Sequence, residues 1–288
     1  MNENKTNINW YPGHMAKTKR EIKERLNLID IIYEVIDARM PISSKIVDID
    51  DLIKDKQKIL IMSKYDLCDK TETDKFIKYY EELGYTVITM DLINGNVSKI
   101  LDKTTELMQE EFKKRKEKGL ISKSVKALVI GVPNAGKSTL INKLAGKKKA
   151  GTAARPGYTK QLSWIRLKDN IELLDSPGIL WPKFEDQTVA KTLAALNSIK
   201  EEVVDNFEIS NFILRKMSEL YKERLEERYG ISCLSEDLIE EYDIIAKRRG
   251  ALLRGGIADY EKVSRIIIKD LQDGYLGKIT FDRINNDK

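Results

Sequence analysis

GVPNAGKST at residues 131–139 decides the fold of this 288-residue chain. The stretch matches the pattern G-x-x-x-x-G-K-[ST], with an apolar run typical of a strand before it and an amphipathic run typical of a helix after it. In that setting the glycines let backbone N–H groups curl around phosphate oxygens, and the helix N-terminus favours negative charge. A chance glycine turn would need neither neighbour. The stretch therefore predicts a phosphate-binding loop in an α/β fold.

The residues of this loop have separate expected tasks. Lys137 would contact the β- and γ-phosphates of a nucleotide and act in catalysis, and the Ser138 hydroxyl would complete the ligand shell of Mg²⁺. The expected nucleotide contacts of the loop are Asn134, Ala135, Gly136, Lys137, Ser138 and Thr139.

Two later stretches would complete the phosphate side of the site. Asp175-Ser-Pro-Gly178 ends a predicted strand, where the Asp175 carboxylate can hold Mg²⁺ through water and the Gly178 N–H can meet the γ-phosphate. D-x-P-G alone is a common turn, but its place after a phosphate loop favours the metal-side role. Between the two motifs, Arg155-Pro-Gly-Tyr-Thr159 offers the Thr159 hydroxyl to the same Mg²⁺.

Ser63-Lys64-Tyr65-Asp66 closes another predicted strand and resembles the guanine-reading motif [NT]-K-x-D. Asp66 would accept hydrogen bonds from guanine N1 and N2, which adenine cannot supply, and the Lys64 stem would lie over the base. A buried carboxylate left unpaired costs a few kcal/mol, so we expect strong discrimination against ATP. Ser63 is shorter than the usual Asn, so we expect one bridging hydrogen bond to be lost or relayed by water. A surface turn is the alternative.

The order of these motifs is unusual, because the base reader precedes the phosphate loop. A sheet keeps its contacts if its old termini are joined and new ones are cut in a surface loop. The order therefore predicts a circularly permuted nucleotide-binding domain. The stretch at 90–95, MDLING, takes the place of the last base-contacting loop, but it lacks the usual Ser-Ala and gives no site residue.

Short apolar runs alternate with amphipathic stretches from residue 29 to about residue 180. Runs rich in Val and Ile predict buried strands at 29–38, 58–64, 85–90 and 125–131. Helices are predicted at about 71–83 and 97–116, and a strand hairpin at 161–167 and 171–175. This alternation favours a mostly parallel sheet with helices on both faces.

The pattern changes after WPKF at 181–184, where strand signals vanish. Apolar residues then recur at helical spacing, as in Ile213 and Met217, and Asp259 can cap a helix that stops before Gly274. We therefore predict an α/β GTPase-like domain at 1–182 and a small all-helical domain at 183–288.

Composition limits the class of protein. The chain is 41% hydrophobic and 34% charged, which is the balance of a folded soluble protein. No apolar run approaches the ~18 residues of a membrane span, and the N-terminus lacks the apolar stretch of a secretory signal. Cys68 and Cys233 lie far apart in sequence and indicate neither a disulfide framework nor a zinc site. We expect a cytoplasmic protein without a membrane partner.

The basic residues gather in clusters at 17–25, 113–118, 147–149 and 247–249, although the net formal charge is only +5. Any one cluster is explained by a solvated helix face or end, and the cluster at 247–249 suits a helix C-terminus before Gly250. Contact with RNA phosphates is the competing role, and the sequence leaves both open.

With its motifs in this order, the chain resembles the YlqF/YawG family of circularly permuted GTPases over nearly its full length. The resemblance rests on the nucleotide motifs above and on WYPGHMAK at 10–17, DARMP at 37–41 and DSPGILWP at 175–182. It implies a GTPase domain followed by a helical RNA-binding domain, with GTP, GDP and Mg²⁺ as ligands. It also implies binding to a late precursor of the large ribosomal subunit, whose rRNA stimulates GTP hydrolysis. We expect a monomer with no DNA partner.

The resemblance further implies a catalytic role for His14, the only histidine of the chain. Small GTPases orient the attacking water with a glutamine after the D-x-x-G motif, but Ile179 stands there and cannot hydrogen-bond. Imidazole can orient a water near neutral pH. The resemblance implies that this histidine enters the active site when the ribosome is bound; a purely structural or exposed histidine is the alternative.

The resemblance also admits a potassium ion at Asn134, because no arginine finger is apparent in the sequence. The alternative is that Asn134 only stabilises its loop.

Three functions stay open at this point. The first is an RNA-stimulated GTPase that acts as an assembly checkpoint. The second is a ribonucleoprotein-binding module in which GTP only sets affinity and hydrolysis is incidental, an option that Ile179 supports. The third is a permuted GTPase that serves something other than the ribosome.

Overall fold

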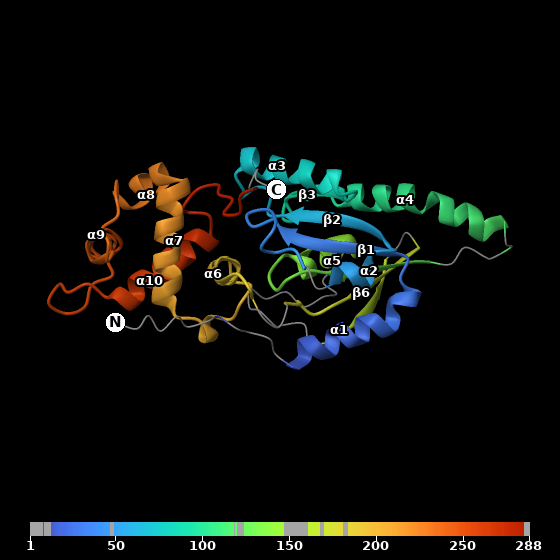
Figure 1. Cartoon of the computed structure of the whole chain (residues 1–288), viewed down its shortest axis with the longest axis horizontal. Helices are drawn as coiled ribbons and strands as arrows, with labels where there is room; N and C mark the ends of the chain where they lie inside the picture. The colour runs from blue at the N-terminus through green and yellow to red at the C-terminus, as the bar shows by residue number, and fades with distance from the viewer. Residues whose placement is uncertain are drawn as a thin grey trace.

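The computed structural model describes residues 8, 13–46, 49–117, 119, 124–146, 161–167, 170–180 and 184–284, apart from the side chains of His14, Asp51 and Arg115. One half of the molecule is an α/β unit and the other half is built from helices (Figure 1). The predicted Thr159 and most of the stretch at 181–184 lie outside the described residues, so the domain boundary at 182/183 stays a prediction.

A six-stranded sheet forms the centre of the α/β half, with the strand order β3-β2-β1-β4-β6-β5. All pairs are parallel except β5 with β6, which are antiparallel as the hairpin prediction requires. The strands are β1 (Ile31–Asp37), β2 (Gln57–Ser63), β3 (Thr86–Met90), β4 (Val125–Ile130), β5 (Ser163–Arg166) and β6 (Ile171–Asp175). The prediction of a mostly parallel α/β sheet is confirmed.

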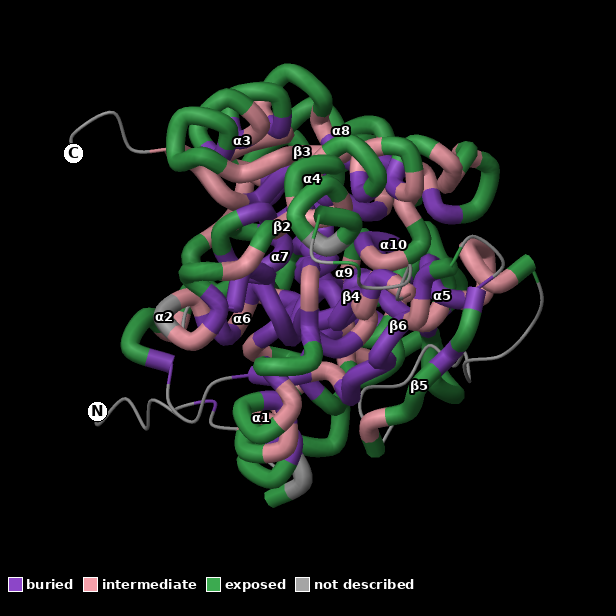
Figure 2. The backbone as a smooth tube through the Cα atoms, turned by 90° about the vertical axis from the view of Figure 1, so that its right-hand side faces the viewer, coloured by how far each residue is buried: buried purple, intermediate pink, exposed green. Residues whose placement is uncertain are grey.

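Helices cover both faces of this sheet, and the apolar strands between them are buried (Figure 2). On one face, Phe76 and Tyr80 of α3 pack in a cluster with Ile36, Leu60 and Met62 of the central strands. The opposite face carries α4, whose Thr104 hydrogen-bonds the Tyr33 hydroxyl of β1 at 2.6 Å. The helices of this half are α1 (Gly13–Arg25), η1 (Leu26–Leu28), α2 (Asp50–Ile53), α3 (Lys70–Glu82), α4 (Ser98–Glu117) and α5 (Lys137–Leu144).

The chain after residue 184 is helical, and within its described residues the one β-bridge joins Leu252 and Ala258. Helix α10 begins at the predicted cap, where Asp259 accepts a hydrogen bond from the Lys262 N–H at 3.0 Å. Helix α9 ends at Gly250, which takes the left-handed conformation with φ +66°. The helices are α6 (Gln187–Ala195), η3 (Glu201–Val203), α7 (Asn206–Leu220), α8 (Lys222–Tyr229), α9 (Ile239–Arg249) and α10 (Tyr260–Gln272).

The C-terminal segment 279–283 returns to the α/β half and ties the two halves together. The Ile279 N–H donates to the Leu67 carbonyl at 3.2 Å, and the Phe281 N–H donates to the Arg39 carbonyl at 2.8 Å. The Asp282 carboxylate then accepts from the backbone N–H of Ser43 at 2.8 Å and from its hydroxyl at 2.6 Å. The helical half is therefore bonded directly to the loops that follow β1 and β2.

Candidate functional site

The sheet brings the predicted motifs to one edge. On one side of β1 lie β2 and then β3, and on the other side lie β4 and then β6. The direction in which the chain adds strands therefore reverses between β1 and β4. In open parallel sheets, ligands bind at the carboxyl ends of the strands beside such a reversal. The base reader follows β2, the phosphate loop follows β4, and Asp175 is the last residue of β6.

Two glycines give the phosphate loop its shape. A Cβ on Gly131 would lie 2.2 Å from the Val35 carbonyl oxygen, so the loop leaves β4 in close contact with β1. Gly136 caps α5 with φ +100°, a conformation that L side chains rarely adopt. The N-terminus of α5 thus points its free N–H groups into the loop, as anion binding requires.

Lys137 is folded back into this loop. Its ammonium donates to the carbonyl oxygens of Gly131 at 3.0 Å and Val132 at 2.8 Å, and the residue is buried. Burial lowers the pKa of the Lys137 ammonium, and the nearby Asp175 carboxylate opposes that shift. The Lys137 ammonium therefore lies inside the loop, where phosphate oxygens could replace the two carbonyl oxygens as its acceptors.

The Asp175 carboxylate fits a cation site. The residue is 3% exposed, and its Oδ1 is buried without a hydrogen-bond partner among the described residues. Burial raises the pKa of Asp175, while the charge of Lys137 acts against the rise. A buried carboxylate oxygen with no donor is costly unless a ligand satisfies it. Ser138, in the first turn of α5, supplies a hydroxyl from the neighbouring loop.

The D-x-P-G stretch packs directly on the phosphate loop. A Cβ on Gly178 would lie 2.7 Å from the Cα and the N atom of Pro133, so a side chain there would require the loop backbone to move. The Ile179 N–H donates to the Gly131 carbonyl at 3.2 Å, and the Ile179 residue is 3% exposed. Ile179 therefore fills the core and leaves the glutamine position of small GTPases without a polar group.

Ser63 joins the base reader to the phosphate loop without a water. Its hydroxyl lies 2.6 Å from the Ala135 carbonyl oxygen and 2.9 Å from that of Ile36. The expectation that one bridging hydrogen bond is lost or relayed by water stays a prediction. A Cβ on Gly136 would lie 3.6 Å from the Ser63 side chain, so the two loops are close enough for the shorter residue to reach.

Asp66 and Lys64 differ in how they are held. Lys64 takes φ +55°, which turns the chain sharply at the end of β2. Its ammonium donates to the Asp37 carboxylate at 2.8 Å. Asp66 is half-buried, and within the described part of the chain no group hydrogen-bonds its carboxylate. The carboxylate at 66 is thus available to an outside donor.

Asp37, the first residue of DARMP at 37–41, borders the site but is not among the residues that the nucleotide motifs predict. It ends β1, the strand between the base reader and the phosphate loop, and is fully buried. An acidic residue at the end of a strand rich in apolar residues is the available signal. Burial alone would raise the pKa of Asp37, but the Arg39 guanidinium and the Lys64 ammonium hold it well below its usual range.

The loop after β3 also borders the site. Leu92 is 5% exposed, and its Cδ1 atom lies 2.7 Å from where a Cβ on Gly136 would stand. Lys143 of α5 donates to the carbonyl oxygens of Ile93 at 2.6 Å and Gly95 at 2.8 Å. The loop after β3 therefore borders the phosphate loop, as expected for the last base-contacting loop. Leu92 and Lys143 hold it there, although the loop lacks the usual Ser-Ala pattern.

The phosphate loop is bonded to the helical half through Asn134. Its side-chain amide donates to the Asn197 carbonyl just after α6, and the Ser198 hydroxyl donates to the Pro133 carbonyl at 2.8 Å. This arrangement supports the loop-stabilising role of Asn134. The His14 backbone lies at the start of α1, but its side chain is outside the described residues, and so is Thr159, so the roles of both residues stay predictions.

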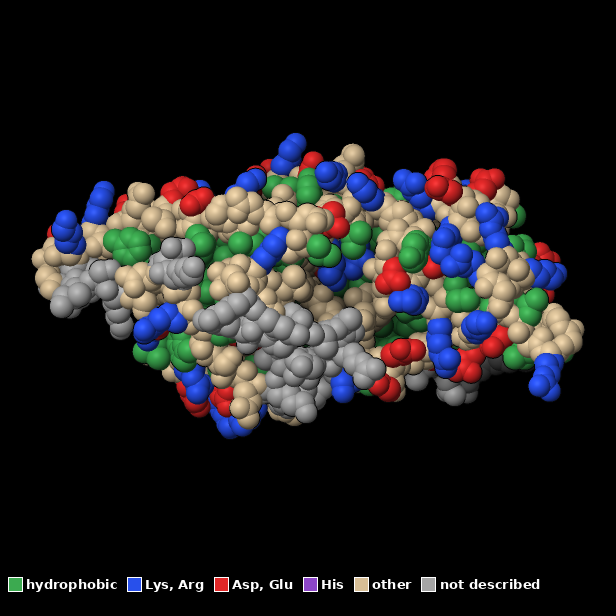
Figure 3. Space-filling model, turned by 180° about the vertical axis from the view of Figure 1, so that it is seen from behind, with side chains coloured by type: hydrophobic (Ala, Val, Ile, Leu, Met, Phe, Trp, Pro, Cys, Tyr) green, Lys and Arg blue, Asp and Glu red, His purple; other side chains and the backbone are tan. Residues whose placement is uncertain are grey.

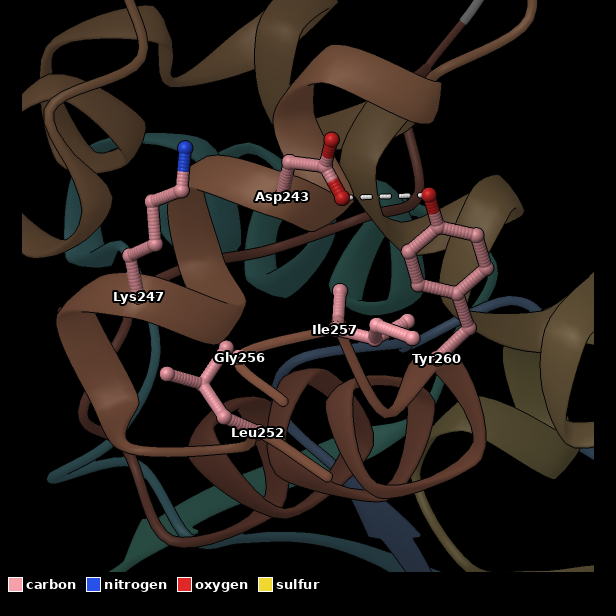
Figure 4. Close-up of a pocket in the computed structure, with 7 residues that line it drawn as sticks. Asp243, Lys247, Leu252, Gly256, Ile257 and Tyr260 are labelled. Atoms are coloured by element: carbon pink, nitrogen blue, oxygen red, sulfur yellow. Dashed lines mark hydrogen bonds between the residues drawn. The ribbon is translucent and has the colours of Figure 1, made fainter. Parts of the chain in front are cut away.

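Two further pockets lie within the helical half. One, of about 300 Å³, is lined by residues 243–260 only, including Lys247, Leu252 and Ile257, and the Tyr260 hydroxyl donates to Asp243 at its rim at 3.0 Å (Figure 4). A second, of about 570 Å³, is strongly basic and is lined by Arg224, Glu227, Arg228, Arg248, Arg249, Gly274, Tyr275, Leu276 and Gly277. Among the described residues, no helix combines the length and apolar character needed to cross a membrane.

Known proteins resemble this chain over nearly its whole length. The family described as 50S ribosome-binding GTPase matches residues 126–230. Ribosome biogenesis GTPase A of Bacillus cereus is 43% identical over 96% of this chain and 93% of its own length. The protein of the same name from Thermotoga maritima is 30% identical over 96% of this chain and 94% of its own length.

Solved structures show the same arrangement. YlqF from T. maritima bound to GNP is 27% identical and superposes with a TM-score of 0.67, covering 93% of this chain and 98% of the other. A GDP-bound YlqF structure gives the same TM-score over 92% of this chain and 99% of its own.

Proposed function

The chain belongs to the family of ribosome biogenesis GTPase A, and from that premise we propose that it binds a late precursor of the large ribosomal subunit and hydrolyses GTP in response to that particle. One observation carries the proposal: the predicted base reader at 63–66, the phosphate loop and the Asp175 carboxylate lie at one edge of the sheet, and the helical half is bonded to that edge. A change in the helices on binding a particle could therefore reach the nucleotide-binding loops through direct hydrogen bonds. The protein would act in the cytoplasm as a monomer.

We expect the nucleotide to lie across the end of β1. Asp66 would accept from guanine N1 and N2, with the stem of Lys64 over the base and Ser63 fixing the distance to the phosphate loop. The backbone from Asn134 to Thr139 would surround the phosphates, and Lys137 would exchange its two carbonyl partners for phosphate oxygens. The Gly178 N–H would meet the γ-phosphate, next to the loop on which it already packs.

The residues present also fit Mg²⁺. Asp175, with its unpartnered buried oxygen, and Ser138 would hold the ion, joined by Thr159. A bound Mg²⁺ neutralises charge on the phosphate oxygens. A potassium ion at Asn134 is compatible with the structure, because the Asn134 amide nitrogen donates to Asn197 and the hydrogen bond does not use the side-chain oxygen.

His14 would orient the attacking water. The buried Ile179 leaves no polar side chain at the usual position, so another group has to accept the proton or hold the water. His14 stands at the start of a helix of thirteen residues, Gly13–Arg25, and could be presented to the site by the bound particle.

The basic pocket of the helical half is the surface we assign to rRNA. Four arginines line it beside Tyr275, which is 60% exposed, and the Arg228 guanidinium stacks 4.7 Å from the Tyr275 ring centroid. Arginines supply contacts to phosphates and an exposed aromatic ring can stack on a base. Basic side chains stand among acidic ones over the face that Figure 3 shows, so net charge alone does not single out a surface for rRNA.

The experiment that tests the proposal measures GTP hydrolysis by the purified chain alone, with large ribosomal subunits, and with small subunits as the matched control particle. We expect large subunits, and not small ones, to raise kcat by at least about a hundredfold, because they would complete the water-orienting arrangement. Equal rates in all three conditions would contradict ribosome-stimulated hydrolysis.

A second candidate function follows from Ile179. Because this buried residue cannot orient a water, GTP could serve only to set affinity for the ribosomal particle. In that case large subunits would bind more tightly in the presence of a non-hydrolysable GTP analogue than with GDP, while kcat stayed unchanged.

A further inference from the structure

Asp37 sits at the centre of a buried charge cluster formed with Arg39 and Lys64. Of these residues, the nucleotide motifs include only Lys64. The Arg39 guanidinium binds the Asp37 carboxylate with two nitrogens, at 3.1 Å from Nε to Oδ1 and 2.9 Å from NH2 to Oδ2. Lys64 donates to the same Oδ2 at 2.8 Å. Asp37 is fully buried and Arg39 is 2% exposed, so water does not screen their contact, whereas the Lys64 side chain is 26% exposed.

This cluster restricts the position of the Lys64 side chain. The backbone of Lys64 is in a left-handed conformation, and its ammonium has to reach back to the end of β1 to meet Asp37. A lysine stem carries several freely rotating bonds, and fixing its far end removes most of that freedom before a base arrives. The Asp37 contact therefore prepares the stem for stacking.

Arg39 connects the cluster to the helical half at two atoms. Its NH1 donates to the carbonyl of Gln272, the last residue of α10, at 3.3 Å. Its own carbonyl accepts from the Phe281 N–H at 2.8 Å, in the returning C-terminal segment. The Gln272 side chain in turn donates to the Ala195 carbonyl at the end of α6 at 3.1 Å. Beyond α6, the Asn197 carbonyl accepts from Asn134 of the phosphate loop.

We propose that Asp37 and Arg39 are positioning residues for guanine recognition, which hold the Lys64 ammonium so that its stem lies over the base, and that Arg39 makes this hold depend on the end of α10. The proposal rests on the proposed function, since it requires a guanine base at Lys64. Neither residue touches the nucleotide. Both act through Lys64, and this separates the role from a general contribution to folding.

A double-mutant cycle on the full chain tests this role. Arg39→Gln, Lys64→Met and the double variant are compared with the wild type for the Kd of a fluorescent GDP analogue. We expect Arg39→Gln to weaken binding by about tenfold, because a charge-assisted contact is lost. Lys64→Met should weaken binding at least as much, and the double variant should match Lys64→Met within about twofold, because Arg39 then has no lysine to position.

The matched control is Arg166→Gln, which also breaks a two-nitrogen arginine–carboxylate pair, with Glu172, but between β5 and β6. We expect it to leave the Kd for GDP unchanged. If the losses of Arg39→Gln and Lys64→Met multiply in the double variant, or if Arg39→Gln binds like the wild type, the positioning role is overturned while the proposed function stands. A wild-type chain that binds no GDP would overturn both.

If Arg39→Gln does not fold, the isosteric Asp37→Asn takes its place in the same cycle. It removes the charge that holds Lys64 and retains an oxygen for the Arg39 N–H, which lies 3.0 Å from Oδ1. The expected and contradicting results are the same.

Discussion

Replacing Asp66 by asparagine is expected to lower the affinity for GDP by about a hundredfold or more. The carboxylate would accept two hydrogen bonds, from guanine N1 and N2, and each such bond to a charged group is worth about 1.5–3 kcal/mol. The asparagine amide keeps one acceptor and presents a donor to the other guanine donor. Xanthine carries a carbonyl oxygen in place of the N2 amino group of guanine, and the asparagine amide can donate to that oxygen. The variant should therefore gain affinity for xanthosine diphosphate relative to GDP.

Competition against a fluorescent GDP analogue measures both changes. Asp55→Asn is the matched control, because Asp55 is an exposed carboxylate in the turn before β2, at the other end of the strand that leads to Asp66. The control should bind GDP as the wild type does. An Asp66→Asn variant that keeps its affinity for GDP would show that another group reads the base.

Replacing His14 by alanine is expected to abolish most of the large-subunit stimulation and to leave GTP affinity within about twofold of the wild type. A positioned proton acceptor contributes about 10²–10⁴ to a rate, so stimulated kcat should fall at least a hundredfold. The loss should appear in kcat, because the phosphate and guanine contacts do not include this residue.

Cosedimentation with large subunits in a non-hydrolysable GTP analogue checks that the His14→Ala variant still binds the particle. Lys23→Ala, an exposed position of the same helix, controls for general damage to α1. Unchanged stimulated turnover in His14→Ala would show that His14 does not act in hydrolysis. It would favour the second candidate function, in which GTP only sets the affinity for the ribosomal particle.

Local sequence patterns were sufficient to predict the sheet. Strands rich in Val and Ile and buried on both faces, such as β1, leave a mostly apolar signal that Glu34 interrupts once, and β4 is followed by the glycine pattern of a phosphate loop. The helix caps at Asp259 and Gly250 are equally local, since each depends on one side chain and the next turn. Helix α1 was not predicted, although the buried Met15, Thr18 and Ile22 have helical spacing.

Contacts between distant segments could not be predicted in this way. The Arg39–Gln272 bond joins residues 233 positions apart, and the bonds of Asp282 to Ser43 span 239. Such contacts depend on how two halves pack, and no short-range pattern encodes that packing. Asp37 is intermediate: its acidity at a strand end was visible, but its partner Lys64 becomes evident only once β1 and β2 are paired in register.

Ser63 bonds the phosphate loop through a contact that side-chain length alone does not predict. Its hydroxyl lies within direct reach of the Ala135 carbonyl. A Cβ on Gly136 would stand 3.6 Å from the Ser63 side chain, at ordinary contact distance, but only 2.7 Å from the Leu92 Cδ1 atom. The missing side chain of Gly136 therefore makes room for Leu92.

Nucleotide competition on the unmodified chain tests the central claim most directly, namely that Asp66 and Lys137 hold opposite ends of one guanosine nucleotide. Unlabelled GDP should displace a fluorescent GDP analogue, and ADP should need at least about a hundredfold higher concentration, because adenine leaves the Asp66 carboxylate without its donors. Failure to bind GDP at all, or displacement by ADP at the same concentration as GDP, would contradict it.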